Sequence, residues 1–120
     1  MGQEIVQEVA SMSEARLLER TYEFLEEPLL GGQDLDTKVR RLLEAEYLRR
    51  LAAYHHTDSV LSRKYGMTFQ EFGDRRVVHR QGFTADVETD AMDWETAVSG
   101  IQTIERKLGQ LRELADEQHD

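Results

Sequence analysis

Hydrophobic residues in the middle of the chain recur every three or four positions from Asp34 to Gly66, with no proline and no glycine in between. This spacing places them on one side of an α-helix and predicts a single long helix over residues 34–66. Asp34 or Asp36 can cap its first turn, and Gly66 can adopt the left-handed conformation that ends a helix. A helix of about eight turns extends roughly 45 Å, so its apolar stripe needs other helices or another chain to cover it. The stripe consists of Leu35, Val39, Leu42, Leu43, Tyr47, Leu51, Tyr54, Leu61 and Tyr65.

A second amphipathic pattern occupies residues 90–120. Its apolar positions alternate in steps of three and four, which is the seam of a heptad helix. Asp90 is the expected N-cap, and Asp93 would lie in the first turn, where the helix dipole favours negative charge. Gly100 and Gly109 weaken the isolated helix, so we expect it to pack against a neighbour. The seam consists of Trp94, Ala97, Ile101, Ile104, Leu108, Leu111 and Ala115.

The N-terminal residues 1–33 carry helical patterns interrupted by capping and helix-breaking residues. Ser11 and Ser13 both suit an N-cap, so we expect a short helix, a turn and then a second helix. Pro28 should end that second helix near Glu27, because the residue before a proline avoids the helical conformation.

The segment between the two long helices is less regular. Thr68, followed three residues later by Glu71, predicts the N-terminus of a short helix. Residues 74–89 show neither the helical nor the strand period, and we interpret them as a loop that orders on a partner. The whole chain is therefore predicted to be one all-α domain, in which a long central helix packs with N- and C-terminal helices as an elongated bundle or a coiled-coil-like dimer. The predicted segments are 1–33, 34–66, 67–89 and 90–120.

Composition narrows the class of protein. The chain has no cysteine, which removes disulfides, thiolate metal sites and cysteine nucleophiles. Its N-terminus, MGQEIVQEV, lacks the basic region and apolar core of a signal peptide, and no apolar run approaches the ~18 residues of a membrane span. We therefore expect a cytoplasmic protein with no membrane partner.

Charge argues against a surface built mainly to bind nucleic acid. The chain has 24 acidic and 15 basic residues, for a net charge of −9, whereas phosphate neutralisation needs clustered cations. Interleaved acids account for much of the basic run in the central helix, since a Glu46–Arg50 pair has the favourable spacing of four. The candidate nucleic-acid contacts that remain are Arg40, Arg41, Arg75 and Arg76.

The candidate chemistry is sparse. His55 and His56 precede Asp58, but adjacent helical side chains point about 100° apart and cannot easily share one ion. Glu44 and Glu46 diverge on the helix for the same reason, and no glycine-rich phosphate loop is present. We therefore predict no catalytic residue, no metal and no cofactor.

Large apolar residues gather around the least regular part of the chain. Phe69 and Phe72 are predicted to cover the junction of the two long helices. We predict that Phe83, Met92 and Trp94 contact a protein partner, because aromatic and methionine side chains flanked by charge are typical of interface anchors. Seam residues Ile101 and Leu108 extend this predicted partner surface.

Two stretches resemble a known family. EVASMSEARLLERTYEFLEE is similar to the N-terminal helical segment of small prokaryotic antitoxin-like proteins, and RKYGMTFQEF with the later DAMDWETA resembles the C-terminal half of small helical proteins encoded beside toxins. The resemblance covers about half of the chain. It implies a non-enzymatic antitoxin that binds and masks a cognate toxin. Such families often also bind their operator as dimers, but the acidic N-terminus here lacks a ribbon-helix-helix strand.

The residues and the resemblance together favour an all-α interaction protein, a homodimer that inhibits a protein partner as an antitoxin does. Long helices with exposed seams suit helix-in-groove recognition. The first alternative is a helical structural or adaptor subunit that self-assembles through its heptad helix. The second is a small hydrolase that uses helix-borne carboxylates.

Overall fold

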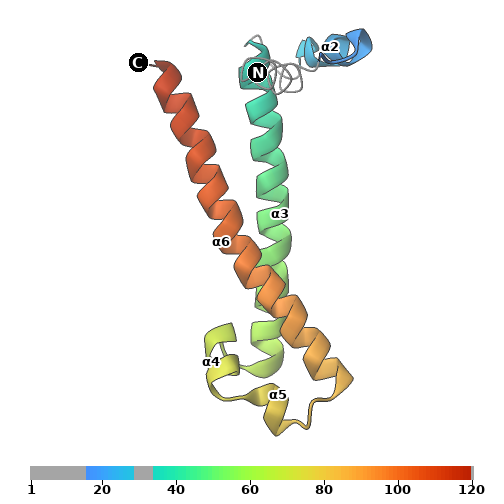
Figure 1. The fold of residues 1–120 in the computed structure, drawn as a ribbon, viewed down its shortest axis with the longest axis vertical. Coiled ribbons are helices and arrows are strands. Elements are labelled where there is room, and N and C mark those ends of the chain that lie inside the picture. The colour runs from blue at the N-terminus through green and yellow to red at the C-terminus, as the bar shows by residue number, and fades with distance from the viewer. Residues whose placement is uncertain (1–15, 29–33, 120) are drawn as a thin grey trace, which may run out of the picture. The chain divides into compact units, whose positions relative to one another are not determined.

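Within the residues that the structure describes, every regular element is an α-helix (Figure 1). The structure is a computed structural model and describes residues 16–28 and 34–119. The chain divides into two units, Met1–Lys38 and Val39–Asp120. The all-α class predicted from the sequence is confirmed. The helices are α2 (Glu19–Leu25), α3 (Leu35–Tyr65), α4 (Phe69–Asp74), α5 (Val77–Arg80) and α6 (Ala85–His119).

In the first unit, α2 ends close to the predicted position. Its last turn closes through the Glu26 N–H, which donates to the Tyr22 carbonyl at 3.0 Å. Leu25 is buried, whereas Leu18 and Phe24 are exposed. The predicted first helix, the turn at Ser11–Ser13 and the glycine pair 31–32 lie outside the described residues.

The long central helix matches its predicted bounds within one residue at each end. The Asp34 carboxylate accepts from the Thr37 N–H at 3.1 Å, which is N-capping as expected. At the other end Gly66 has a φ of 66°, and its N–H donates to the Ser62 carbonyl at 2.8 Å. This left-handed glycine ends α3 as the sequence predicted.

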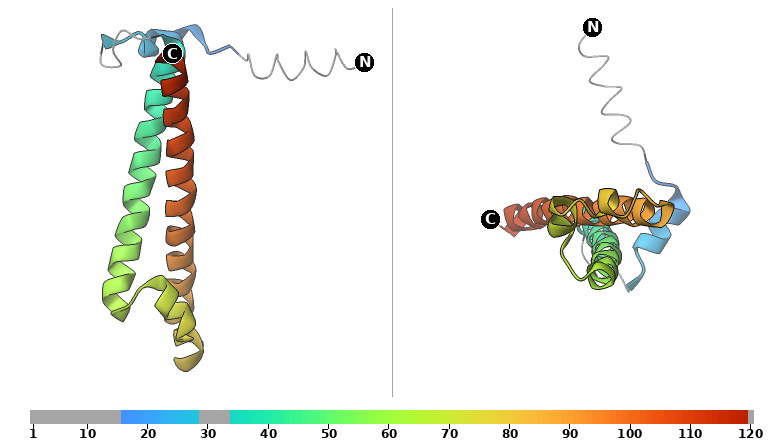
Figure 2. Two further views of the ribbon diagram at one scale, coloured as in Figure 1. Left: turned by 90° about the vertical axis from the view of Figure 1, so that its left-hand side faces the viewer. Right: turned by 90° about the horizontal axis from the view of Figure 1, so that it is seen from below.

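Helix α6 returns along α3 in the opposite direction, so the two form an antiparallel hairpin (Figures 1 and 2). Arg112, in the C-terminal part of α6, donates to the Glu44 carboxylate, in the N-terminal part of α3, at 3.0 Å. Lys64 meets Asp90 at 2.6 Å near the opposite end. The predicted heptad seam is thus covered within one chain: Trp94, Ala97, Ile104 and Leu108 are buried, and Ile101 and Leu111 are half-buried.

A close approach between the two helices occurs at Gly100. A Cβ atom added there would overlap the Tyr54 ring and lie 2.6 Å from its Cδ2 atom, whereas a Cβ atom at Gly109 would meet nothing within 4 Å. Gly100 therefore lets Tyr54 lie against the α6 backbone. Glycine weakens the isolated helix at this position, as the sequence predicted, but a larger residue would clash with Tyr54.

The hydrophobic core lies at the end of the hairpin where α4 and α5 pack against α6 (Figure 1). Phe72 and Trp94 are its large aromatic members, with ring centroids 5.0 Å apart, and Tyr65 stacks on Trp94 at 5.9 Å. Thr68 caps α4 as predicted, since its hydroxyl accepts from the Glu71 N–H at 3.2 Å. The buried members of this cluster are Leu61, Phe72, Val77, Val87 and Trp94.

The segment predicted as a loop, residues 74–89, is largely helical. It contains α5, and α6 begins at Ala85, five residues before the predicted cap Asp90. Val77 and Val87 bury their side chains in the core, and this packing stabilises helical turns too short to display a period. Asp90 consequently lies inside α6 and serves as an ion-pair partner.

Candidate protein-interaction site

The structure separates the five predicted partner-binding residues into two groups. Trp94 is 0 % exposed and Leu108 is 4 % exposed, while Ile101 is half-buried in the seam between α3 and α6. Phe83 and Met92 are 55 % and 68 % exposed. No partner can reach Trp94 or Leu108 without opening the hairpin, so we assign both to the core and keep Phe83 and Met92 as candidate contacts.

Trp94 is held by a polar contact as well as by packing. Its indole N–H donates to the Asp58 carboxylate of α3 at 2.7 Å. Burying an indole N–H without an acceptor costs free energy. The hydrogen bond to Asp58 removes this cost and allows Trp94 to be fully buried. The sequence placed Asp58 beside two histidines as a candidate ligand group, and spacing alone did not reveal this role.

Phe83 is held at the turn between α5 and α6 in an unusual backbone conformation. Gly82 and Phe83 have φ values of 71° and 57°, and non-glycine residues rarely occupy this left-handed region. The Gly82 N–H donates to the His79 carbonyl at 3.1 Å, and the Phe83 N–H donates to the Val78 carbonyl at 3.0 Å. The ring meets the His79 imidazole edge-on, with centroids 5.4 Å apart. The turn therefore holds the backbone at Phe83 in place and leaves its aromatic side chain largely in solvent.

An ion-pair cluster joins α3 to the first turns of α6 near this end. Asp90 accepts from the Lys64 ammonium and from the Tyr65 hydroxyl, both at 2.6 Å. The hydrogen bond from Lys64, followed by that from Tyr65, lowers the pKa of Asp90 below its ordinary value. Partial burial and the bond to Asp90 raise the pKa of Tyr65 to about 12.

Asp90 should contribute a pH-dependent part of the stability. Because its folded-state pKa is lowered, this contribution is present above the ordinary Asp pKa of 3.8 and is lost as the pH falls through the lowered value. Asp90→Asn should therefore flatten the acid limb of a plot of unfolding free energy against pH. The measurement is urea unfolding at a series of acidic pH values, with Asp86→Asn, an exposed acid on the same helix, as the control. Equal acid limbs in wild type and Asp90→Asn would contradict this role.

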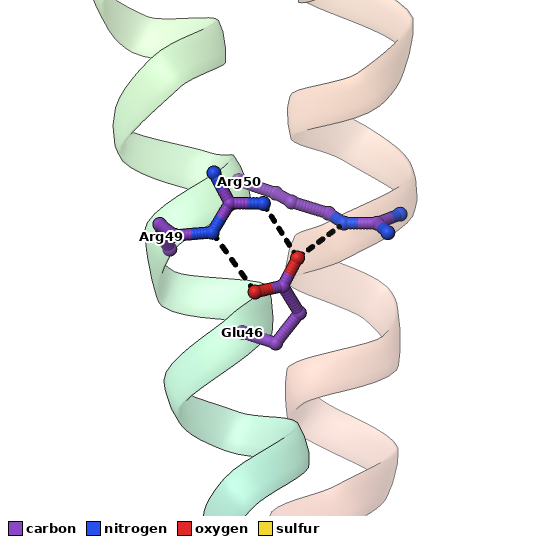
Figure 3. A network of polar contacts seen from close by, with 3 residues as sticks. All are labelled: Glu46, Arg49 and Arg50. Atoms are coloured by element: carbon purple, nitrogen blue, oxygen red, sulfur yellow. Dashed lines mark hydrogen bonds and ion pairs between the residues drawn. The ribbon is translucent and has the colours of Figure 1, made fainter.

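Glu46 forms a second polar network along α3. Figure 3 shows its carboxylate between two guanidinium groups: Arg49 Nη2 lies 2.6 Å and Arg50 Nε 3.0 Å from Glu46 Oε1. The hydrogen bonds from Arg49 and then Arg50 lower the pKa of Glu46 to about 2. The predicted Glu46–Arg50 pair is confirmed.

The four candidate nucleic-acid contacts are not brought together. Arg40 and Arg41 lie in the first turns of α3, whereas Arg75 and Arg76 lie between α4 and α5, beyond the other end of that helix. Arg75 also pairs with Glu71 at 3.4 Å. These arginines therefore form no single basic patch.

Across 16–28 and 34–119, no three His, Cys, Asp or Glu side chains are grouped so that they could hold a metal ion, and His55 and His56 are exposed. No helix in this part of the chain is both long enough and apolar enough to cross a membrane. Comparison of the chain with models of known families, with characterised proteins and with solved structures gives no match.

Proposed function

We propose that this chain is a non-enzymatic interaction protein that binds and inhibits a cognate protein partner, in the manner of an antitoxin. The observation that carries the proposal is the exposed Phe83 on a hydrogen-bonded turn. Its ring is 55 % exposed although large aromatic side chains normally lower their free energy by leaving water. An exposed aromatic side chain of this kind is typical of the anchor residues that dominate the binding energy at protein interfaces.

The backbone at Phe83 supports the same reading. A non-glycine residue in the left-handed region costs free energy, and such positions gather at functional sites. Because two backbone hydrogen bonds hold the turn, the backbone at Phe83 loses little conformational freedom on binding. We therefore propose that Phe83 enters an apolar pocket of the partner, and that the hairpin behind it serves as a rigid support.

The antitoxin assignment also rests on sequence resemblance. EVASMSEARLLERTYEFLEE resembles a segment of antitoxin-like proteins, and RKYGMTFQEF resembles a segment of small helical proteins encoded beside toxins. Under this proposal the partner is a toxin, and the bound hairpin end masks its active site. Under this proposal the chain acts by binding and carries out no reaction of its own. Cytoplasmic action follows from the same proposal, since such toxins act inside the cell that makes them.

The experiment is co-expression with the product of the reading frame that adjoins the gene of this chain. We expect the neighbouring product to arrest growth when expressed alone, and the chain to restore growth by forming a complex with it. Phe83→Ala should weaken the purified complex by about thirtyfold, or ~2 kcal/mol. Leu48→Ala, at a 44 % exposed leucine on α3, is the matched control and should leave the affinity unchanged.

Two results would contradict the proposal in different ways. A neighbouring product that neither arrests growth nor binds the chain would remove the antitoxin assignment. An unchanged affinity of Phe83→Ala for a partner that does bind would remove Phe83 as the anchor.

A further inference from the structure

A groove of about 420 Å³ runs between α3 and α6 on one side of the hairpin. Its two charged residues, Arg50 of α3 and Lys107 of α6, are both cations. Among the described residues that line it there is no carboxylate, although the chain has 24 acidic residues. A concave surface that carries charge of one sign raises the local concentration of ligands of the opposite sign. The groove therefore favours an anion.

The two cations have donors available for a ligand. Arg50 donates to Glu46 through its Nε atom at 3.0 Å, and Figure 3 shows its guanidinium group extending from α3 towards α6. Within residues 16–28 and 34–119, the terminal nitrogens of Arg50 and the Lys107 ammonium have no protein acceptor. Guanidinium groups match the geometry of phosphate oxygens, and lysine ammonium groups bind phosphate as point charges. An anion held by both residues would be bound from two helices at once.

Four hydroxyl groups lie in the same groove. They belong to Tyr47 and Tyr54 of α3 and to Ser99 and Thr103 of α6. In the described part of the chain none of them forms a hydrogen bond with the protein, and no buried side-chain oxygen lacks a partner. These hydroxyl oxygens are therefore open to solvent. Because a hydroxyl rotates to suit its acceptor, these groups can donate to the oxygens of an anion that the two cations hold.

The groove also offers apolar surface to a ligand. The Tyr54 ring lies against the α6 backbone at Gly100, and the Tyr47 side chain adds a second aromatic ring. Aromatic rings pack favourably against planar apolar groups. A separate groove beside α4 is lined by Asp58 and Glu95, so an anion would be repelled there.

We infer that the groove between α3 and α6 binds a small organic phosphate. The phosphate group accepts from Arg50 and Lys107, and the ring or hydrocarbon part of the ligand lies against the tyrosine side chains. A phosphate is preferred over a carboxylate, because its additional charge and its third oxygen engage both cations and the hydroxyl groups. This site is separate from the proposed partner contact, since Phe83 is not part of the groove.

The test is isothermal titration calorimetry of the full-length chain at low salt, with AMP, adenosine and inorganic phosphate as probes. AMP carries both a ring and a phosphate group, whereas each of the other two probes carries one of them. We expect AMP to bind at least about tenfold more tightly than adenosine, and its affinity to fall as salt is added. Inorganic phosphate should compete with AMP and bind more weakly. Phosphate that binds as tightly as AMP would overturn the organic ligand and identify free phosphate in its place.

Neighbouring residues supply matched control variants. Arg50→Gln removes a guanidinium group from the groove, whereas Arg49→Gln removes one that also binds Glu46 but does not line the groove. Lys107→Gln is paired with Arg106→Gln in the same way, since both residues are exposed on α6 and Lys107 lines the groove. We expect Arg50→Gln and Lys107→Gln each to weaken AMP binding at least about tenfold, and both controls to bind AMP as wild type does.

Two results would overturn the assignment of an anion site to this groove. The first is the absence of AMP binding to wild type at millimolar concentration. The second is an equal loss of affinity in the groove variants and their controls, because binding would then follow the net charge of the chain. Circular dichroism of each variant should show an unchanged helix content, so that a loss of affinity reports on the groove.

Discussion

Trp94→Ala is expected to lower the free energy of unfolding by about 3–5 kcal/mol, the range found when large buried aromatic residues are truncated. Trp94 is fully buried, contacts three other aromatic rings and donates to Asp58. Alanine would leave a cavity among these rings and would remove the donor that satisfies the Asp58 carboxylate. Urea unfolding followed by circular dichroism measures the change without relying on the tryptophan signal.

Met92→Ala is the matched control for this prediction. Met92 lies two residues away on the same helix, but its side chain is 68 % exposed. Truncation there should change the unfolding free energy by no more than about 0.5 kcal/mol in the monomer. Similar small changes in both variants would mean that Trp94 is not enclosed by the hairpin.

Phe72→Ala is expected to destabilise the chain by a comparable amount, about 3–5 kcal/mol. Phe72 is 3 % exposed and is the buried residue of α4. A helix of six residues is too short to be stable alone, so its attachment depends on this side chain. Amide hydrogen exchange should show that α4 and α5 lose protection together with the core.

Phe83→Ala makes the same chemical change at an exposed position and serves as the control. Because the Phe83 ring is largely in water, its loss should cost less than about 1 kcal/mol of stability. Equal effects of the two substitutions would indicate that residues 66–84 form a loop without a core of their own. The expected difference also allows Phe83→Ala to be used in binding experiments as a folded variant.

The parts of the fold that the sequence predicts well are those with local signals. Asp34 and Gly66 delimit α3 because a capping carboxylate and a left-handed glycine act within one turn of the helix end. Thr68 and Glu71 identify the start of α4 for the same reason. The regular seam of α6 also predicts its buried face, because helical periodicity depends only on residue spacing.

The parts that it misses depend on contacts between distant residues. A helix as short as α5 has no period to detect, and it exists because Val77 packs against the core. Asp90 has the composition of a cap, and only the proximity of Lys64 and Tyr65 shows its role. Trp94 has the same local sequence whether it faces α3 or another protein, so spacing could not assign it to the core.

The candidate site was predicted in the same uneven way. Exposed aromatic and methionine residues near the turn were recognisable from composition, and Phe83 and Met92 remain candidates. The left-handed conformation at Phe83 could not be predicted, since phenylalanine rarely adopts it.

The central claim is that α3 and α6 close into a hairpin within one chain, which leaves the Phe83 side chain exposed for binding. Because the chain has no cysteine, Arg49→Cys and Arg106→Cys allow two spin labels to be attached on the two helices. Electron–electron double resonance, with the doubly labelled chain diluted into excess unlabelled chain, should give a short and narrow distance distribution. A long or broad distribution, or a short distance that disappears on dilution, would show that the helices pair between copies and would contradict the account.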